Sequence, residues 1–133
     1  MWLSIILATA ALGLAFIAGM TFKRSLLGRG TIAPPRYLRM SIAHWNIDLN
    51  TPEAEAIFRQ IATDGVAVFR AQPGFVRYRL MRADGSTTIA VAEWESEDLG
   101  RAGAERYRAW MRSVGIMDRF TLETRAGDIV AGS

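Results

Sequence analysis

The feature that most constrains this chain is an uninterrupted apolar run near its N-terminal end. Residues Trp2 to Phe22 cover 21 positions without a charged side chain. A helix rises about 1.5 Å per residue, so a helix of this length reaches across the ~30 Å hydrocarbon core of a bilayer. The run therefore predicts a transmembrane anchor over residues 1–22 that tethers the rest of the chain to a lipid bilayer.

A cleaved signal peptide is the main alternative to an anchor. Signal peptides carry basic residues before a shorter apolar stretch. Here the segment from Met1 to Ala18 contains no basic side chain. The sequence thus favours a retained anchor, and cleavage stays open as the alternative.

Basic residues are concentrated directly after the apolar run. Five lie between Lys23 and Arg39 without an acid, whereas residues 40–133 hold eleven basic and thirteen acidic side chains. The net charge of +3 therefore reflects the flank and not the domain. Such a flank is typical of a segment that lies against anionic headgroups, not of a nucleic-acid-binding surface. By the positive-inside tendency it predicts a single-pass protein of the cell membrane whose C-terminal domain is cytoplasmic.

Small residues recur every four positions within the apolar run. Ala11, Ala15 and Gly19 share one face of the predicted helix, where the backbone of another helix has room to approach. They are a candidate interface with a partner subunit of a membrane complex. Because Ala and Gly are common in membrane helices, the alternative is that this face has no specific partner.

The remaining sequence predicts one domain after a linker. Residues 23–36 include two glycines and two prolines, which disfavour regular structure, so we interpret them as a basic juxtamembrane linker. Residues 37–133 form the predicted domain. Alternating apolar residues predict strands over 38–47, 75–81, 87–95 and 119–125.

Two helices are predicted between these strands. Thr51 and Ser96 are good N-caps, each followed by acidic residues in the first turn and by apolar residues at helical spacing. Asp84-Gly85 between the second and third strands is typical of a hairpin. The order β-α-β-β-α-β predicts an α+β, ferredoxin-like domain, in which a four-stranded antiparallel sheet has both helices on one face.

Two short motifs resemble those of a known family. Gln72-Pro73-Gly74-Phe75 ends the first helix, and the residues from Glu93 to Asp98 lead from the third strand into the second helix. Together they resemble the antibiotic biosynthesis monooxygenase family of ferredoxin-like, dimeric α+β barrels, over residues 38–126. The resemblance implies relatives that include cofactor-independent oxygenases of aromatic polyketides, haem-degrading enzymes, and members without an established activity.

No cofactor is predicted. In the haem-degrading branch a tryptophan that Trp94 resembles is paired with a histidine on the following helix, but residues 97–112 contain no histidine. The chain also lacks cysteine, which excludes thiolate metal sites and cysteine nucleophiles. No spacing typical of metal ligands is present, so we predict no metal site.

His44, Asn46 and Trp94 are the tentative catalytic residues. His44 and Asn46 point to one face of the first predicted strand and Trp45 to the other. If their face borders the cavity between sheet and helices, His44 is a candidate proton acceptor and Asn46 a candidate donor to an oxyanion. The alternative is that both lie at a strand end and bond to backbone or water.

Aromatic residues predict a pocket for a hydrophobic small molecule. Tyr78, Tyr107 and Trp110 are its candidate walls, with Trp94 at its mouth. The alternative is that these side chains are simply part of the core, since they fall on the predicted buried spacing.

Two functions from different classes remain open on the sequence. The first is a binding or accessory subunit of a membrane protein complex. The second is a cofactor-independent monooxygenase that acts on a hydrophobic aromatic substrate of the quinol or polyketide type. In either case we expect a homodimer or a partner subunit, because the helices cover one sheet face and leave residues such as Ile89 and Val91 on the other.

The distribution of charge gives a testable topology. We expect a reporter fused after Ser133 to be active only if it works in the cytoplasm, because the basic residues flank one end of the apolar helix. Paired fusions to a cytoplasmic and an exported reporter check this. Activity of the exported reporter would contradict both the orientation and the cytoplasmic location of the domain.

Overall fold

The computed structural model describes residues 36–133, which lie within a compact unit formed by Pro34–Ser133. The predicted anchor, with its Ala11, Ala15 and Gly19 face, and all but the last residue of the linker lie outside the described residues. Within residues 36–133, no helix has both the length and the apolar composition needed to cross a bilayer.

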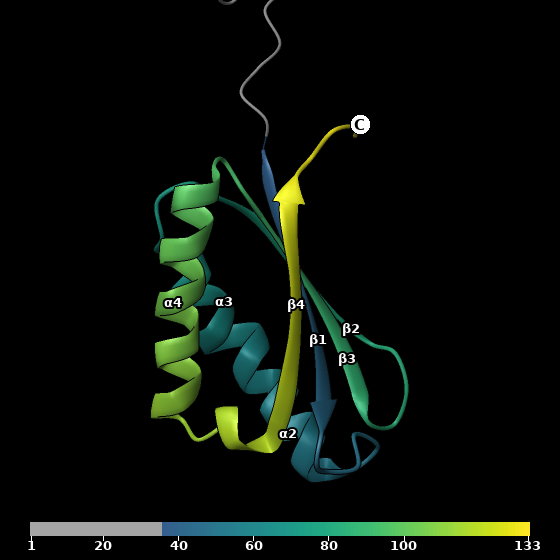
Figure 1. Cartoon of the computed structure of the whole chain (residues 1–133). Coiled ribbons are helices and arrows are strands. Elements are labelled where there is room, and N and C mark those ends of the chain that lie inside the picture. The colour runs from purple at the N-terminus through teal and green to yellow at the C-terminus, as the bar shows by residue number, and fades with distance from the viewer. Residues whose placement is uncertain (1–35) are drawn as a thin grey trace, which may run out of the picture. The chain divides into compact units, whose positions relative to one another are not determined.

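The four predicted strands form one antiparallel sheet (Figure 1). Its strands lie in the order β2-β3-β1-β4, so the first strand along the chain is central and pairs with both the third and the fourth. A hairpin joins the second and third strands, as the Asp-Gly pair predicts, and the Asp84 carboxylate accepts a 2.9 Å bond from the backbone N–H of Ser86. The predicted β-α-β-β-α-β order is confirmed. The strands are β1 Tyr37–Trp45, β2 Phe75–Arg82, β3 Thr87–Trp94 and β4 Phe120–Asp128.

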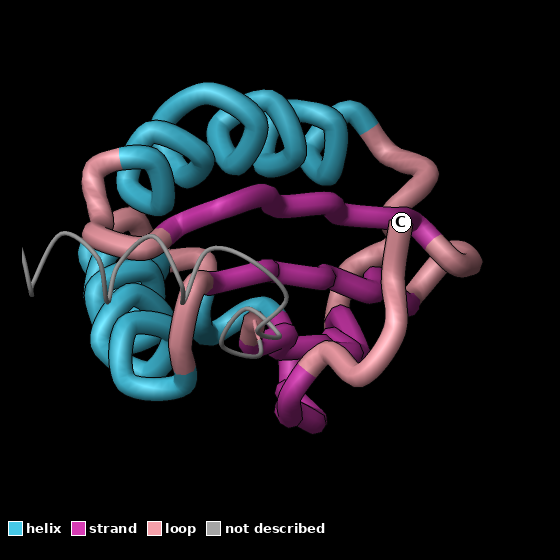
Figure 2. Tube along the Cα trace, turned by 90° about the horizontal axis from the view of Figure 1, so that it is seen from above, coloured by secondary structure: helices cyan, strands magenta, loops and turns pink. Residues whose placement is uncertain are grey.

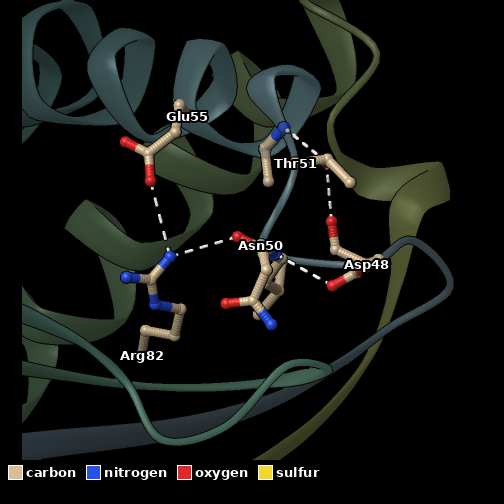
Figure 3. A network of polar contacts seen from close by, with 7 residues as sticks. Asp48, Asn50, Thr51, Glu55 and Arg82 are labelled. Atoms are coloured by element: carbon tan, nitrogen blue, oxygen red, sulfur yellow. Dashed lines mark hydrogen bonds and ion pairs between the residues drawn. The ribbon is translucent and has the colours of Figure 1, made fainter.

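Helix α2 (Pro52–Gln60) begins at the predicted cap. The Thr51 hydroxyl donates to the Asp48 carbonyl at 2.7 Å and accepts from the backbone N–H three residues later at 3.3 Å. Figure 3 shows how Arg82, the last residue of β2, joins this turn to the helix. Its guanidinium donates to the Leu49 carbonyl at 3.1 Å and to the Glu55 carboxylate at 3.4 Å. These contacts close one end of the layer between helix and sheet.

The first helix is interrupted, which the sequence does not predict. After α2 the chain makes a π turn, η1 (Ile61–Gly65), and then continues as α3 (Val66–Arg70). Within this wider turn Ile61 and Gly65 are buried, whereas Ala62 is exposed. A methyl group at Gly65 would lie 2.9 Å from the Trp110 ring, so the turn brings a bare backbone against an aromatic side chain.

Helix α4 (Glu97–Ser113) starts after the predicted cap at Ser96. The Ser96 hydroxyl accepts a 3.3 Å bond from the Leu99 backbone N–H, and Gly115 follows the helix with φ of 76°, a conformation that favours glycine. A 3-10 turn, η2 (Met117–Arg119), then leads into β4. Figures 1 and 2 show α3 and α4 together on one side of the sheet. The core between these layers includes Trp45, Leu49, Phe69, Trp94, Tyr107, Met111 and Ile116.

The other face of the sheet is not covered by any helix among the described residues. Cross-strand pairs on it include Met40 with Val91 and Ile42 with Ile89, all four of which are half-buried in the monomer. Charged side chains border this apolar centre, and the Arg77 guanidinium pairs with the Glu93 carboxylate at 2.9 Å. An apolar patch rimmed by charge is typical of a protein interface.

The uncovered face leads to a prediction of self-association. We expect the fragment Tyr37–Ser133 to form a dimer in solution, because pairing two such faces removes both apolar patches from water. Light scattering at several concentrations measures its mass. Val91→Lys should shift the fragment towards monomer, whereas Ala109→Lys on the exposed surface of α4 should not. A wild-type fragment that stays monomeric at high concentration would contradict the homodimer.

Candidate active site

A cavity of about 90 Å³ lies between the sheet and the helices. Its wall takes residues from all four strands, from the π turn and from α3 and α4. Every second residue of β1, from Arg39 to Trp45, belongs to this wall, because the side chains of a strand alternate between its faces. Aromatic side chains dominate the lining, and they are Trp45, Phe69, Tyr78, Trp94, Tyr107 and Phe120.

Trp94 is the most deeply buried of these side chains. It ends β3 and has no exposed surface. Two glycines of α4 lie against it and its neighbour: a methyl group at Gly103 would be 2.0 Å from the indole, and one at Gly100 would be 2.6 Å from Tyr37. Side chains at these positions are therefore excluded, and the helix approaches the sheet closely only because both residues are glycine.

The two tryptophans of the cavity wall differ in their hydrogen bonding. The indole N–H of Trp45 donates to the hydroxyl of Thr88 at 2.8 Å, and both side chains are buried. The indole N–H of Trp94 has no partner, and among the described residues it is the one buried side-chain polar atom in this condition. Leaving such a donor unpaired costs about 1–3 kcal/mol. Trp94 belongs to the cavity wall, so a ligand that displaces its neighbours can reach this covered donor.

Tyr78 and Tyr107 provide two phenol groups in the wall. Phe69 packs against both rings, with centroid distances of 4.6 and 4.1 Å. Burial raises the pKa of the Tyr78 phenol, and a hydrogen bond with Tyr107 offsets part of this rise. Burial also raises the pKa of Tyr107, and its interactions with Tyr78 raise it further. Both phenols are therefore neutral near pH 7 and act as hydrogen-bonding groups, not as bases.

Two arginines also line the cavity. Arg39 comes from β1 and Arg108 from α4, where the latter pairs with the Glu105 carboxylate. No aspartate, glutamate or histidine belongs to the lining that the described residues form. The charged groups of the wall are thus all positive, so the cavity favours an anion over a cation.

His44 does not border the cavity. It is exposed, and it lies on the face of β1 opposite to Trp45, between Thr87 and Thr121 of the neighbouring strands. The condition on which its role as proton acceptor depended is therefore not met. The alternation of β1 allowed His44 or Trp45 to face the helices, and the large apolar ring is the one buried there.

Asn46 is also away from the cavity. It follows the last residue of β1, and its side-chain amide donates to the Asp118 carbonyl at 3.0 Å. This bond links the end of β1 to the η2 turn, as in the alternative interpretation of a residue that bonds to backbone at a strand end. The structure thus separates His44 and Asn46 from Trp94.

The expected aromatic wall is assembled except for one member. Trp94, Tyr78 and Tyr107 line the cavity together, but Trp110 is not in its lining. Trp110 packs instead on Gly65 of the π turn and on Tyr107, with a ring-centroid distance of 5.5 Å to the latter. The α4 residues that line the cavity are Ala104, Tyr107, Arg108 and Met111, which follow helical spacing, and Trp110 is not on that face of the helix.

Sequence reasoning missed the two arginines of the wall. Arg39 was counted with the basic flank that follows the apolar run, although it shares the face of β1 that carries Trp45. Alternation from Trp45 back along the strand would have identified it. Arg108 occurs one helical turn after Ala104, which also lines the cavity. No group of three His, Asp or Glu side chains in residues 36–133 is arranged to hold a metal ion.

The fold and the site define a class: a ferredoxin-like α+β domain with an aromatic cavity between its sheet and its helices. Residues 40–114, more than half of the 133-residue chain, match the antibiotic biosynthesis monooxygenase family. The chain belongs to this family. No curated protein matches it in sequence.

Solved structures share the fold at low sequence identity. SnoaB, a cofactor-independent oxygenase from Streptomyces nogalater, has 18% identity and a TM-score of 0.59, with 74% of this chain and 97% of that one covered. A Streptomyces coelicolor monooxygenase from the gene ActVA-Orf6, in complex with nanaomycin D, has 20% identity, a TM-score of 0.56, and coverages of 74% and 91%. A dimeric ferredoxin-like protein from an uncultured marine organism has 9% identity, a TM-score of 0.54, and coverages of 75% and 100%. At these identities the likeness shows the fold.

The contact between α4 and Trp94 gives a stability prediction. Ala ordinarily stabilises a helix interior by about 1 kcal/mol over Gly. We expect Gly103→Ala to destabilise the domain instead, by about 1–3 kcal/mol, because the added methyl group overlaps the indole. Urea unfolding of the wild-type and variant domains measures the difference. The loss should shrink in a Trp94→Leu background, and an unchanged or increased stability of Gly103→Ala alone would contradict the close contact.

Proposed function

We propose that the domain is a cofactor-independent monooxygenase that oxidises a hydrophobic aromatic substrate, of the quinol or polyketide type, in the cavity between sheet and helices. The observation that carries the proposal is the buried, unpaired N–H of Trp94 in an aromatic wall. Family membership supports it. So do two proteins of the same fold, one described as a cofactor-independent oxygenase and one as a monooxygenase.

The reaction needs no added reductant if the substrate supplies the electrons. Loss of a proton from an activated ring CH₂ leaves an anion, which donates an electron to dioxygen. The two radicals then form a carbon–oxygen bond, and the resulting peroxide anion takes up a proton from water to give a hydroperoxide. Loss of the second C–H proton breaks the O–O bond, leaving a ring carbonyl and one molecule of water. In this scheme the Trp94 N–H donates to the oxygen that becomes negative, where a fixed donor stabilises developing charge.

The cavity assists the first step by electrostatics. Its described lining holds no carboxylate or imidazole, and its two phenols are neutral near pH 7 because burial raises the pKa of each. The positive charges of Arg39 and Arg108 favour the anionic form of a bound substrate and so lower the pKa of its acidic proton. We propose that water accepts this proton. Water thus takes the part of proton acceptor that the sequence suggested for His44.

Binding of a fused-ring molecule requires the cavity to enlarge. Its volume of about 90 Å³ is below the ~300–1,000 Å³ typical of ligand pockets. An adjoining groove of about 460 Å³ lies between the π turn and β2. Ile61, Tyr78 and Leu80 border both spaces. Rotation of these side chains is the proposed way in which the two spaces join around a substrate.

A role at the membrane is predicted from residues that precede the described domain. The transmembrane anchor, the cytoplasmic location and an accessory role in a membrane complex all depend on residues 1–35, and they stay predictions from the sequence. The described cavity favours the monooxygenase over the accessory subunit. A homodimer is compatible with either, and a dimeric protein of the same fold supports it.

Substitution of Trp94 tests the proposed activity. We expect Trp94→Phe to lower the turnover of anthrone by about a hundredfold, because loss of one donor to an oxyanion costs this order of rate. Oxygen uptake and the absorbance of the quinone product measure turnover, and circular dichroism checks that the variant is folded. His44→Gln is the matched control, since His44 is exposed on the other sheet face, and it should retain full activity.

Two results would contradict the monooxygenase. One is full activity of Trp94→Phe. The other is a wild-type protein that consumes no oxygen with anthrone or with a naphthohydroquinone. If in addition the protein purifies from its native membrane with a fixed set of other subunits, the accessory function becomes the better explanation.

A further inference from the structure

One part of the cavity wall, formed by β1 and α4, carries two arginines, Arg39 and Arg108. We propose that the aromatic substrate carries a carboxylate and that Arg39 and Arg108 bind this group, so that the cavity selects aromatic acids over neutral analogues. This inference rests on the proposed function, whose substrate class it narrows. The observation behind it is that Arg39 of β1 and Arg108 of α4 line the same cavity as Trp94.

Arg39 is half-buried and forms no ion pair within residues 36–133. The residues directly opposite it are Ala92 of β3 and Ala126 of β4, and the nearest acid on β4 is Asp128, an exposed diagonal neighbour. Partial burial of an unpaired charge is costly, and an anionic ligand compensates for that cost.

Arg108 faces the same space from the helix. Its side chain is 31% exposed, and its partner Glu105 is 66% exposed. Glu105 is not in the cavity lining, so the ion pair lies towards solvent while the arginine also reaches the wall. A guanidinium has five N–H donors, and a carboxylate from a ligand can use those that Glu105 leaves free.

The position of Trp94 indicates that the anion belongs to the aromatic molecule. Arg39 is opposite Ala92, two residues before Trp94 on the same face of β3. Arg39 and Trp94 are therefore diagonal neighbours, a relation that separates Cβ atoms by roughly 7–8 Å or less. A ring system bound against Trp94 and Phe69 can thus extend a carboxylate to the arginines. A small anion alone would leave the aromatic wall unfilled.

The neighbouring groove does not offer the same chemistry. It is bordered by Arg79 and Arg82, but Glu55 also belongs to it. The Arg82 guanidinium already donates to the Leu49 carbonyl and to Glu55, as Figure 3 shows. Its positive charge is therefore balanced by the protein. The groove's other arginine, Arg79, is exposed, whereas Arg39 of the inner cavity is half-buried, forms no ion pair with a described residue and lies beside the aromatic wall.

A pair of probes that differ only in charge tests the inference. We expect the purified full-length chain, in a neutral detergent, to bind 2-naphthoic acid at least about tenfold more tightly than 2-naphthamide, as measured by calorimetry. The preference should weaken as salt is raised. Arg39→Gln should remove it and Arg39→Lys should retain part of it. Arg101→Gln is the matched control, because Arg101 is exposed on α4 and pairs with Glu97 outside the cavity, and it should keep the full preference.

Several results would overturn the inference. These are equal affinity for the acid and the amide, an unchanged preference in Arg39→Gln, or acetate that competes as well as naphthoate on a molar basis. If Arg39→Gln does not fold, Arg108→Gln provides the same comparison. Binding is measured without turnover, so the two proposals fail separately. Acid preference without oxygen uptake would defeat the monooxygenase, and turnover of neutral anthrone without acid preference would defeat the inference.

Discussion

The contact between the Trp94 indole and the bare backbone of α4 at Gly103 determines the architecture of this domain. It sets how closely the helix approaches the sheet, because any side chain at that glycine would overlap the ring. The cavity lies directly beyond this contact, where the helix changes from glycine to Ala104, Tyr107 and Arg108. The same packing buries the indole completely and leaves its N–H without a partner. This packing thus fixes both the position of the cavity and the burial of an unpaired donor on one residue of its wall.

The polar groups of the cavity favour electrostatic over acid–base assistance. The phenols of Tyr78 and Tyr107 remain neutral because burial raises the pKa of each, and no carboxylate or imidazole joins them in the described lining. Positive charge enters only through the two arginines. A site of this kind stabilises an anion that the substrate forms by itself, which agrees with chemistry in which the substrate provides the electrons for dioxygen.

The π turn between α2 and α3 contributes to the same site. By rotating the chain after α2, it buries Ile61 between the cavity and the adjoining groove, and it sets Gly65 against Trp110. π turns often occur at functional sites, because they move side chains out of the regular helical pattern. Here Ile61 of the turn lines the cavity, while Gly65 of the turn lies against Trp110, which is outside the lining.

The sequence by itself determined the elements and their order. The caps at Thr51 and Ser96 and the hairpin at Asp84-Gly85 depend on neighbouring residues only, so local chemistry was enough to predict them. Two short motifs were enough to predict the family. The apolar run before residue 36 predicts a membrane anchor on the same local grounds.

The tertiary structure alone decided which side chains share the cavity. Alternation along β1 shows that His44 and Trp45 point to opposite faces, but only the packing of α4 determines which face is inside. That choice excluded His44 and brought Arg39 into the wall. The tertiary structure also decided whether each buried indole N–H has a hydrogen-bond acceptor. Thr88 of β3 accepts from Trp45 of β1, whereas no described residue accepts from the Trp94 N–H. Side chains that are distant in the sequence make or withhold these contacts, and no local pattern encodes them.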